Sequence, residues 1–333
     1  MYKYERDREV GETMFKYAVI GRGKIVDTFI SGARLTGKLK LEAVYSREEV
    51  TGREYAAKYG VEKVYTDLND LVNDREIQAV YIASPNSCHE WQSEFLLKGG
   101  KHVICEKPIV TSAEGYRRLK ALADSKGLVY MEAIIPIFGK SRNQIKGALD
   151  KIGKIAMARI DYCQLSSRYD AFMRGEHVNI FDMSLAAGTL MDLGIYCVYA
   201  AVDLLGVPKN IQVAASYLYN GADGSGSAIY EYDTFLAVLS YSKVGQSTAP
   251  CEIVGDKGSI IIERVGLYMG AYLVQNGEKT PLFEEQPKDV LMSYEASAFV
   301  DFIQGISMER YEESSRLCYE VHCCMDRMKT FYF

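Results

Sequence analysis

The sequence predicts an α/β protein with two parts of different construction: a parallel sheet covered by helices, then an α+β part built on a large, mostly antiparallel sheet. Between residues 15 and 135, short runs rich in Val and Ile alternate with longer amphipathic stretches, which is typical of βαβ units. Beyond residue 135, where Pro136 interrupts the pattern, long segments with period-two alternation and Gly-containing turns indicate antiparallel strands. A length of 333 residues is enough for two such domains.

The pattern also predicts the individual elements. In the first part we expect strands, separated by helices, at 16–21, 39–46, 77–84, 101–106 and 128–133. In the second part we expect strands at 154–166, 210–220, 229–242, 259–269 and 270–277, and helices at 142–153, 188–205, 289–305 and 312–331. The predicted division is a charged N-terminal extension (1–14), a first domain (15–135) and a second domain (136–333).

The composition favours small molecules as partners. The net charge of −5 and the pI near 5.6 give no basic surplus for nucleic acid or an anionic membrane surface. No apolar run looks long enough to cross a bilayer, and residues 1–14 are charged where a signal peptide would be apolar. Eight scattered cysteines without a CxxC pair suggest reduced thiols, and four histidines without ligand spacing predict no metal site. We therefore expect a cytoplasmic protein with neither nucleic-acid nor membrane partners.

A glycine turn follows the first strand. Gly21 and Gly23 stand between that strand and a helix, where the first glycine permits a tight bend and the second lets the backbone approach a pyrophosphate. Val26 occupies the third position, so only two of the three usual glycines are present. Such turns also occur for structural reasons alone, but the repeated βαβ context favours a dinucleotide-binding Rossmann domain.

The end of the second strand bears on the choice of cofactor. Ser46 and Arg47 stand where a site that prefers NAD usually has an acid, and a hydroxyl followed by an arginine suits a 2′-phosphate. This favours NADP, with NAD as the alternative. A surface arginine at the start of a helix is the plainer interpretation of Arg47.

Two further sites carry chemistry. Glu106, Lys107 and Pro108 follow a buried strand at the edge where open parallel sheets bind ligands. Pro108 restricts Lys107 to extended geometry and is able to adopt a cis bond, whereas the plainer alternative is a lysine in solvent. Asp192 and Tyr196 stand four apart in an apolar helix, so they are expected on one face. A nearby ammonium and a helix N-terminus would lower the pKa of the phenol, which is ordinarily near 10.

On the opposite side of this helix, Leu193, Cys197 and Leu204 are expected to pack inward, whereas Gly188 shares the face of Asp192 and Tyr196. Most of the 25 tyrosines must be packing residues, so the phenol alone is weak evidence for a site. An unpaired buried carboxylate is costly, which makes Asp192 harder to explain by packing.

"ASPNSCHE" followed by "GGKHVICEKPIVTSAEG", with the glycine turn upstream, resembles the glucose-fructose oxidoreductase, inositol dehydrogenase and rhizopine-catabolism (Gfo/Idh/MocA) family from about residue 16 onward. The resemblance implies that Lys107 helps to bind substrate and that Glu106 lies near the nicotinamide. It implies that His89 is the family's usual histidine, more often structural. The cofactor-binding set is Gly21, Arg22, Gly23, Lys24, Ile25, Ser46, Arg47, Ser84, Pro85, Asn86, His89, Glu106 and Lys107.

"LAAGTLMDLGIYCV" matches the family's Asp-x-Gly-x-His segment, with Tyr196 at the usual histidine. This is the version of glucose-fructose oxidoreductase, the dimeric dihydrodiol dehydrogenases and some sugar 1-dehydrogenases, most of which use NADP. The resemblance implies NADP(H)-dependent hydride transfer between nicotinamide C4 and a hydroxyl-bearing carbon of a sugar, polyol or trans-dihydrodiol. The predicted catalytic residues are Lys107, Tyr196 and Asp192. Tyr196 would exchange a proton with the reacting hydroxyl, and Lys107 would adjust the pKa of Tyr196. Asp192 would bind an adjacent substrate hydroxyl or orient Lys107.

Three points stay open at this stage. A non-catalytic regulator that senses NADP on the same fold is the alternative function, although the presence of both Lys107 and Tyr196 argues against it. A homodimer or homotetramer through the open face of the second sheet is implied by the resemblance. The stretch before the catalytic helix could line the pocket or form an exposed loop; its polar members are Arg168, Tyr169, Arg174, His177 and Asn179.

Overall fold

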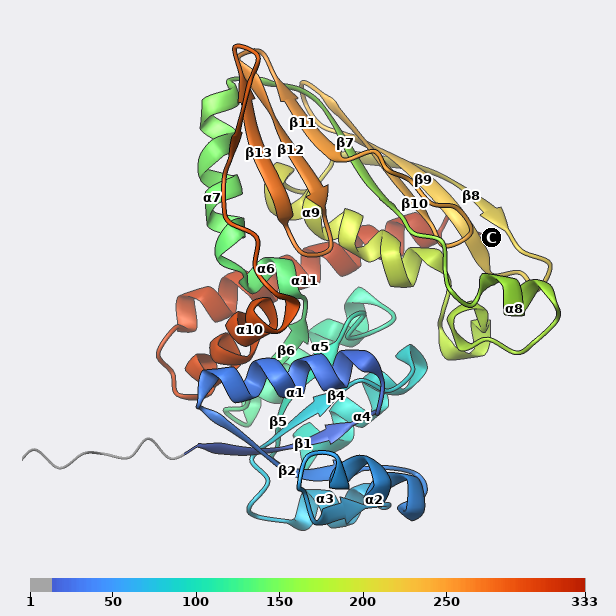
Figure 1. Cartoon of the computed structure of the whole chain (residues 1–333), viewed down its shortest axis with the longest axis vertical. Coiled ribbons are helices and arrows are strands. Elements are labelled where there is room, and N and C mark those ends of the chain that lie inside the picture. The colour runs from blue at the N-terminus through green and yellow to red at the C-terminus, as the bar shows by residue number, and fades with distance from the viewer. Residues whose placement is uncertain (1–13, 333) are drawn as a thin grey trace, which may run out of the picture.

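The computed structural model describes residues 14–332 and confirms the predicted α/β architecture with two sheets (Figure 1). The predicted extension, except its last residue, lies outside the described residues. Sheet A is parallel, in the order β3-β2-β1-β4-β5-β6. Its strands are β1 (Phe15–Ile20), β2 (Leu39–Tyr45), β3 (Lys63–Tyr65), β4 (Ala79–Ile82), β5 (His102–Glu106) and β6 (Tyr130–Ala133). The intervening helices are α1 (Lys24–Thr36), α2 (Glu49–Ala57), α3 (Leu68–Asn73), α4 (Asn86–Lys98) and α5 (Ala113–Ser125).

The strand order of sheet A reverses at β1, which pairs with both β2 and β4. Ligands of open parallel sheets bind at such a switch point, beyond the carboxyl ends of the strands. Gly21, the residue after β1, has φ 114°, and a Cβ there would lie 2.4 Å from the carbonyl oxygen of Ala83, the residue after β4. Only glycine permits this close approach of the two loops.

Sheet B has the order β14-β13-β12-β11-β7-β10-β9-β8, and its pairs are antiparallel except for β7 with β10. Its strands are β7 (Ile155–Cys163), β8 (Asn210–Tyr217), β9 (Asp223–Glu231), β10 (Leu236–Ser242), β11 (Cys251–Gly255), β12 (Gly258–Arg264), β13 (Met269–Gln275) and β14 (Glu278–Pro281). The helical elements are α6 (Ile135–Phe138), α7 (Lys140–Leu149), η1 (Asp150–Ile152), α8 (Tyr169–Met173), η2 (Asn179–Phe181), η3 (Met183–Leu185), η4 (Leu190–Gly194), α9 (Ile195–Leu205), α10 (Lys288–Ile303) and α11 (Met308–Lys329).

The strands of sheet B differ in detail from the prediction. The alternating segment predicted at 229–242 is the end of β9 and the whole of β10, joined by a hairpin in which the rings of Tyr232 and Phe235 stack. The short strands β11 and β14, like β3 in sheet A, were not predicted, because three to five residues carry too little periodicity. Figure 1 shows α9 and α11 on one side of the sheet.

The end of the chain packs back onto the first part. Helix α10 lies along α1, where a Cβ on Gly32 would be 2.8 Å from the Cβ of Met292, so the absence of a side chain permits this contact. Lys38 and Asp301 form an ion pair of 2.7 Å beside it. Residues 288–303 therefore cover sheet A although they follow sheet B in the sequence, and the division at residue 135 stays a prediction.

The expectation that no apolar run could cross a bilayer is wrong by length and composition alone. Residues Met183–Leu205 are long and apolar enough to qualify, and 67% of the most apolar stretch is buried inside the protein. The run is not one regular helix, because η3, a π-helical turn and α9 follow one another, and α9 packs against β7, β10 and α11. Such packing is that of a core helix.

Candidate active site

A cavity of about 670 Å³ lies between the carboxyl ends of β4 and β5 and the α9 side of sheet B. All three predicted catalytic residues, Lys107, Asp192 and Tyr196, line it together with Glu106. Lys107 follows β5, Asp192 lies in η4 and Tyr196 lies in the first turn of α9, so the two parts of the chain bring these side chains together.

Lys107 makes the central contacts of this cavity. Its Nζ lies 2.6 Å from Oδ1 and 2.9 Å from the carbonyl oxygen of Asp192, and 4.9 Å from the centroid of the Tyr196 ring. The Lys107–Pro108 peptide bond is cis. The ammonium is thus fixed by two acceptors and an aromatic face, and Lys107 is not a loop lysine in solvent.

Tyr196 differs from the expectation in its pKa. Burial raises the pKa of the phenol well above its usual value of 10, although Lys107 acts in the opposite direction. The predicted net lowering is therefore wrong, because the cost of burying a phenolate exceeds the gain from one ammonium. In the protein without ligands Tyr196 is a neutral phenol, and it meets the ring of Tyr162 edge-on at 5.5 Å between centroids.

A second lysine, which the sequence analysis missed, reaches the same carboxylate. Lys243 follows β10, and its Nζ contacts Oδ2 of Asp192 while Lys107 holds Oδ1. Burial, and the positive charge of Lys107, lower the pKa of Lys243 to about 8. The carboxylate of Asp192 is therefore shared between two ammoniums that line one cavity.

The helix that carries Asp192 and Tyr196 begins with a π-helical turn, Leu190–Gly194, and not as the regular α-helix predicted from residue 188. The carboxylate of Asp223 on β9 accepts the backbone N–H groups of Thr189 (3.0 Å) and Leu190 (2.7 Å), which fixes this start. A Cβ on Gly188, whose φ is 119°, would lie 2.1 Å from Asp223 Oδ1.

The glycine before the helix therefore makes room for the carboxylate that caps it. Leu193, Cys197 and Leu204 are buried as predicted. Leu193 also lines the cavity, which the prediction did not include.

The glycine turn has the form expected of a dinucleotide site. Gly23 caps α1, and a Cβ there would meet nothing within 4 Å, so the space in front of the helix N-terminus is open. Val26, at the position of the third glycine, is completely buried and fills the core below. Arg22 and Lys24 are exposed on either side of Gly23, and Ile25 lines the cavity. These residues fit a pyrophosphate at the helix N-terminus.

The end of β2 presents one exposed cation. Arg47 is exposed and forms no ion pair among residues 14–332, whereas Ser46 is buried. The Ser46 hydroxyl lies 3.3 Å from the Thr51 hydroxyl and accepts weakly from the N–H of Glu48 at 3.4 Å. Ser46 thus has a local role at the start of α2, and Arg47 is the side chain free to meet a ribose phosphate.

The loop after β4 is tied to its surroundings. Ser84 donates from its hydroxyl to Gln92 Oε1 (2.6 Å), Pro85 caps α4, and the side-chain amide of Asn86 donates to the carbonyl of Ala186 (2.9 Å). The ring nitrogens of the buried His89 lie 2.8 Å from the carbonyl oxygens of Ser84 and Pro108. His89 therefore links the β4 and β5 loops, and its contact with a cofactor stays a prediction.

Glu106 faces the core side of the cavity. It accepts a hydrogen bond of 2.6 Å from the hydroxyl of Tyr81, and burial raises its pKa against the effects of that bond and of Lys107. Burial also raises the pKa of Glu295 on α10, with the charge of Glu106 as a second cause. Burial therefore opposes ionisation of both carboxyls.

The stretch before the catalytic helix contributes less than its polar residues suggested. Of those named from the sequence, Asn179 lines an adjoining hollow, whereas Arg174 pairs with Glu176 and His177 with Asp182 at the surface. The cavity is lined instead by the residues that follow β7, which sequence reasoning had not singled out: Gln164, Leu165, Ser166 and Ser167.

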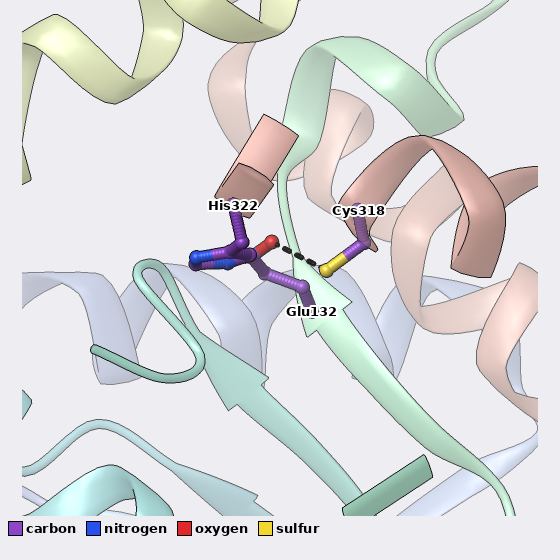
Figure 2. Close-up of side chains that lie close together, drawn as sticks. All are labelled: Glu132, Cys318 and His322. Atoms are coloured by element: carbon purple, nitrogen blue, oxygen red, sulfur yellow. Dashed lines mark hydrogen bonds and ion pairs between the residues drawn. The ribbon is translucent and has the colours of Figure 1, made fainter. Parts of the chain in front are cut away.

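The carboxylate of Glu132 lies in the core, outside the lining of the cavity, and Figure 2 shows two of the side chains around it. Glu132 on β6 accepts from the N–H of Ile109 (2.8 Å), the hydroxyl of Tyr199 and the thiol of Cys318 (3.0 Å), and lies 3.3 Å from Nε2 of His322. Cys318 and His322 are four apart on α11 and both point at Glu132 in Figure 2. Four donors satisfy the carboxylate, so these residues, called below the Glu132 cluster, need no ion to explain their arrangement.

Comparison with known proteins defines the class. Residues 15–134 match the model of an oxidoreductase family with an NAD-binding Rossmann fold, and residues 144–261 match the Gfo/Idh/MocA C-terminal domain. The protein is thus an oxidoreductase with a nicotinamide-dinucleotide domain.

Individual relatives agree with the class. The chain is 37% identical to scyllo-inositol 2-dehydrogenase (NADP(+)) IolU of Bacillus subtilis over 302 residues, 90% of this chain and 92% of that protein. It is 27% identical to trans-1,2-dihydrobenzene-1,2-diol dehydrogenase of Mus musculus, over 83% of this chain and 81% of that one. KijD10, a 3-ketoreductase from Actinomadura kijaniata solved with NADP and TDP-benzene, shares the fold with a TM-score of 0.81 at 19% identity, over 96% of this chain and 98% of that one. The chain belongs to the Gfo/Idh/MocA family, which confirms the resemblance seen in the sequence.

Proposed function

We propose that the protein is an NADP(H)-dependent dehydrogenase or reductase of a sugar, polyol or trans-dihydrodiol. The observation that carries this proposal is the meeting of Lys107, Asp192 and Tyr196 in one cavity that extends to the loop after β4 and to Ile25 in the first turn of α1. The NADP dependence of the Bacillus subtilis relative and the exposed Arg47 both favour NADP over NAD.

The bound nicotinamide would accept a hydride from the substrate carbon, or donate one to it. In oxidation, the phenolate oxygen of Tyr196 would accept the hydroxyl proton of the substrate as the carbonyl forms. In reduction, Tyr196 donates its proton to the carbonyl oxygen. Lys107 would hold the substrate oxygen and stabilise the phenolate. Because burial keeps Tyr196 protonated, reduction starts from the resting form, whereas oxidation first needs the phenol to lose its proton.

A turnover assay tests this function. Purified protein with NADP⁺ and a panel of inositols, aldoses and trans-dihydrodiols should produce the absorbance of reduced nicotinamide, and a faster rate at higher pH because oxidation needs the phenolate. Parallel assays with NAD⁺ measure the cofactor preference. A protein that binds NADP, as a thermal shift shows, yet turns over no member of the panel in either direction would instead be a sensor.

We further propose that the open face of sheet B joins two copies of the chain. Met157, Ile229, Leu236 and Val238 on adjacent strands are between 36% and 50% exposed, and Leu236 pairs with Met157 as Val238 pairs with Ile229. A contiguous apolar surface of this kind usually marks an interface. Light scattering should give a dimer or tetramer, and Val238→Lys should lower the mass; an unchanged mass, or a monomeric wild type, would contradict it.

A further inference from the structure

The backbone of Lys243 is fixed by two hydrogen bonds, and its side chain points into the cavity. Its N–H donates to the carbonyl of Gly224 (3.0 Å), and its own carbonyl accepts from the N–H of Ser166 (2.9 Å). The backbone is therefore fixed between the start of β9 and the loop after β7. The side chain is 9% exposed, and that remaining surface lies on the cavity.

The ammonium has hydrogen-bonding capacity that the protein does not use. Within residues 14–332, the side chain of Lys243 donates only to Asp192, although a lysine has three N–H donors. Asp192 already has an ion-pair partner in Lys107, so a second buried cation is not needed to compensate its charge. Burying an ammonium with spare donors is unfavourable unless another acceptor meets it.

The geometry sets the two ammoniums side by side over the cavity. The carboxylate of Asp192 accepts from Lys107 at Oδ1 and from Lys243 at Oδ2. Because the two oxygens of one carboxylate reach both ammoniums, two substrate oxygens on neighbouring carbons can reach both as well. Lys107 is the one next to Tyr196, where the reacting oxygen would lie. An oxygen held by Lys243 would then belong to the next carbon.

We propose that Lys243 is a specificity-determining residue that binds the oxygen on the carbon adjacent to the reacting one, so that the enzyme selects vicinal diols and α-hydroxy ketones. The proposal rests on the proposed function. It gives Asp192 the task of holding the two ammoniums at this spacing, because each of its carboxylate oxygens accepts from one of them.

Two isomeric diols test the proposal with the full protein and NADP⁺. trans-Cyclohexane-1,2-diol has neighbouring oxygens, whereas trans-cyclohexane-1,3-diol has the same groups one carbon further apart. The wild type should prefer the 1,2-diol in kcat/KM. Lys243→Met should lower kcat/KM for the 1,2-diol by about 10- to 100-fold, the worth of a hydrogen bond to a charged donor, and leave the 1,3-diol within about threefold.

Two variants serve as controls. Lys243→Arg keeps the charge and should retain most of the preference, and Lys257→Met, at an exposed lysine in the turn between β11 and β12, should match the wild type. A thermal shift with NADP⁺ should show that each variant folds and binds the cofactor. If Lys243→Met weakens both diols equally, Lys243 only positions Asp192, and the specificity role is overturned; a wild type without preference also overturns it.

The pH dependence of the preference provides a second readout. The ratio of the two kcat/KM values should fall as pH rises through about 8, because Lys243 then loses its charge, while Lys243→Arg should keep a flat ratio. Glu106 and Tyr196 lie on the side of the reacting oxygen, which both diols share, so changes in their ionisation cancel in the ratio. If no polyol, sugar or diol is oxidised at all, the proposed function fails; turnover with an unchanged ratio in Lys243→Met refutes only the role of Lys243.

Discussion

Asp192 and Glu132 are both carboxylates held by several donors, yet their surroundings differ. Asp192 is one-third exposed to a cavity and is held by two lysine ammoniums. Glu132 is sealed in the core and receives a backbone N–H, a phenol, a thiol and an imidazole. The first arrangement therefore keeps spare donors for a ligand, whereas the donors of the second are all used within the protein. Changes at the first should affect turnover, and changes at the second should affect stability.

The largest expected effect is on turnover at the open site. Tyr196→Phe should lower kcat by about 10²- to 10⁴-fold, the usual contribution of a positioned acid or base, with the same free energy of unfolding and the same affinity for NADP. Steady-state kinetics and a thermal shift measure the two quantities. Tyr162→Phe, which changes the neighbouring tyrosine in the same cavity, is the matched control and should stay near wild type. Near-normal turnover in Tyr196→Phe would remove Tyr196 from the mechanism.

The sealed site should show the opposite pattern. Glu132→Ala leaves four buried donors without an acceptor and should lower the free energy of unfolding by about 3–5 kcal/mol. Urea unfolding measures this, with Glu54→Ala, at an exposed position of α2, as the control within about 0.5 kcal/mol. The kcat per folded molecule should be unchanged. A loss of turnover without a loss of stability would place Glu132 in the active site.

A smaller effect is expected at the edge of the cofactor site. Arg47→Ala should raise KM for NADP by about tenfold and leave KM for NAD unchanged, because the lost charge meets only the 2′-phosphate. Arg53→Ala removes another exposed arginine of the same region, one already paired with Glu49, and should alter neither constant. Equal effects of Arg47→Ala on both cofactors would assign the arginine a different role.

The smallest expected effect is on the free energy of unfolding at low pH. Burial opposes ionisation of Glu132, but the charge of His322 and the hydrogen bonds outweigh it, so its pKa lies below its ordinary value of 4.5. Its stabilisation is therefore complete above pH 4.5 and is lost as pH falls toward the lowered pKa. Urea midpoints of the wild type and Glu132→Gln should differ most near neutral pH and converge on acidification. If the difference between the two urea midpoints instead grows in acid, the carboxyl of Glu132 binds its proton more tightly in the folded protein than in the unfolded chain.

The sequence predicted the two sheets, because the switch from βαβ alternation to period-two alternation is visible in its pattern. It also predicted that Lys107, Asp192 and Tyr196 lie together, because Lys107 follows a strand and the other two residues stand one helical turn apart. It missed Lys243, which has no local motif and enters the cavity only through the register of β10 beside β7. It misjudged the pKa of Tyr196 because charges can be counted in a sequence, whereas burial depends on tertiary packing.

The residues of the Glu132 cluster stand out individually in the sequence, but their contact does not. Glu132 interrupts an apolar strand, and Cys318 and His322 stand four apart on an amphipathic helix, so each side of the contact was visible. The partnership between them spans nearly two hundred residues, and no local pattern encodes it. The π-helical turn was also beyond reach, because the carboxylate that fixes it comes from β9.

The return of α10 to the first domain has a consequence for stability. The chain passes from sheet A to sheet B after β6 and returns between β14 and α10, and the elements at these two crossings, α6 and α10, pack on each other. Helix α11 then contacts α5 beside sheet A as well as α9 and β8 of the second part. At its end, Lys329 donates to the carbonyl of Thr111 and the hydroxyl of Tyr332 meets that of Tyr241. Neither part therefore buries its full apolar surface without residues 288–332, so the last two helices hold both parts in one cooperative unit.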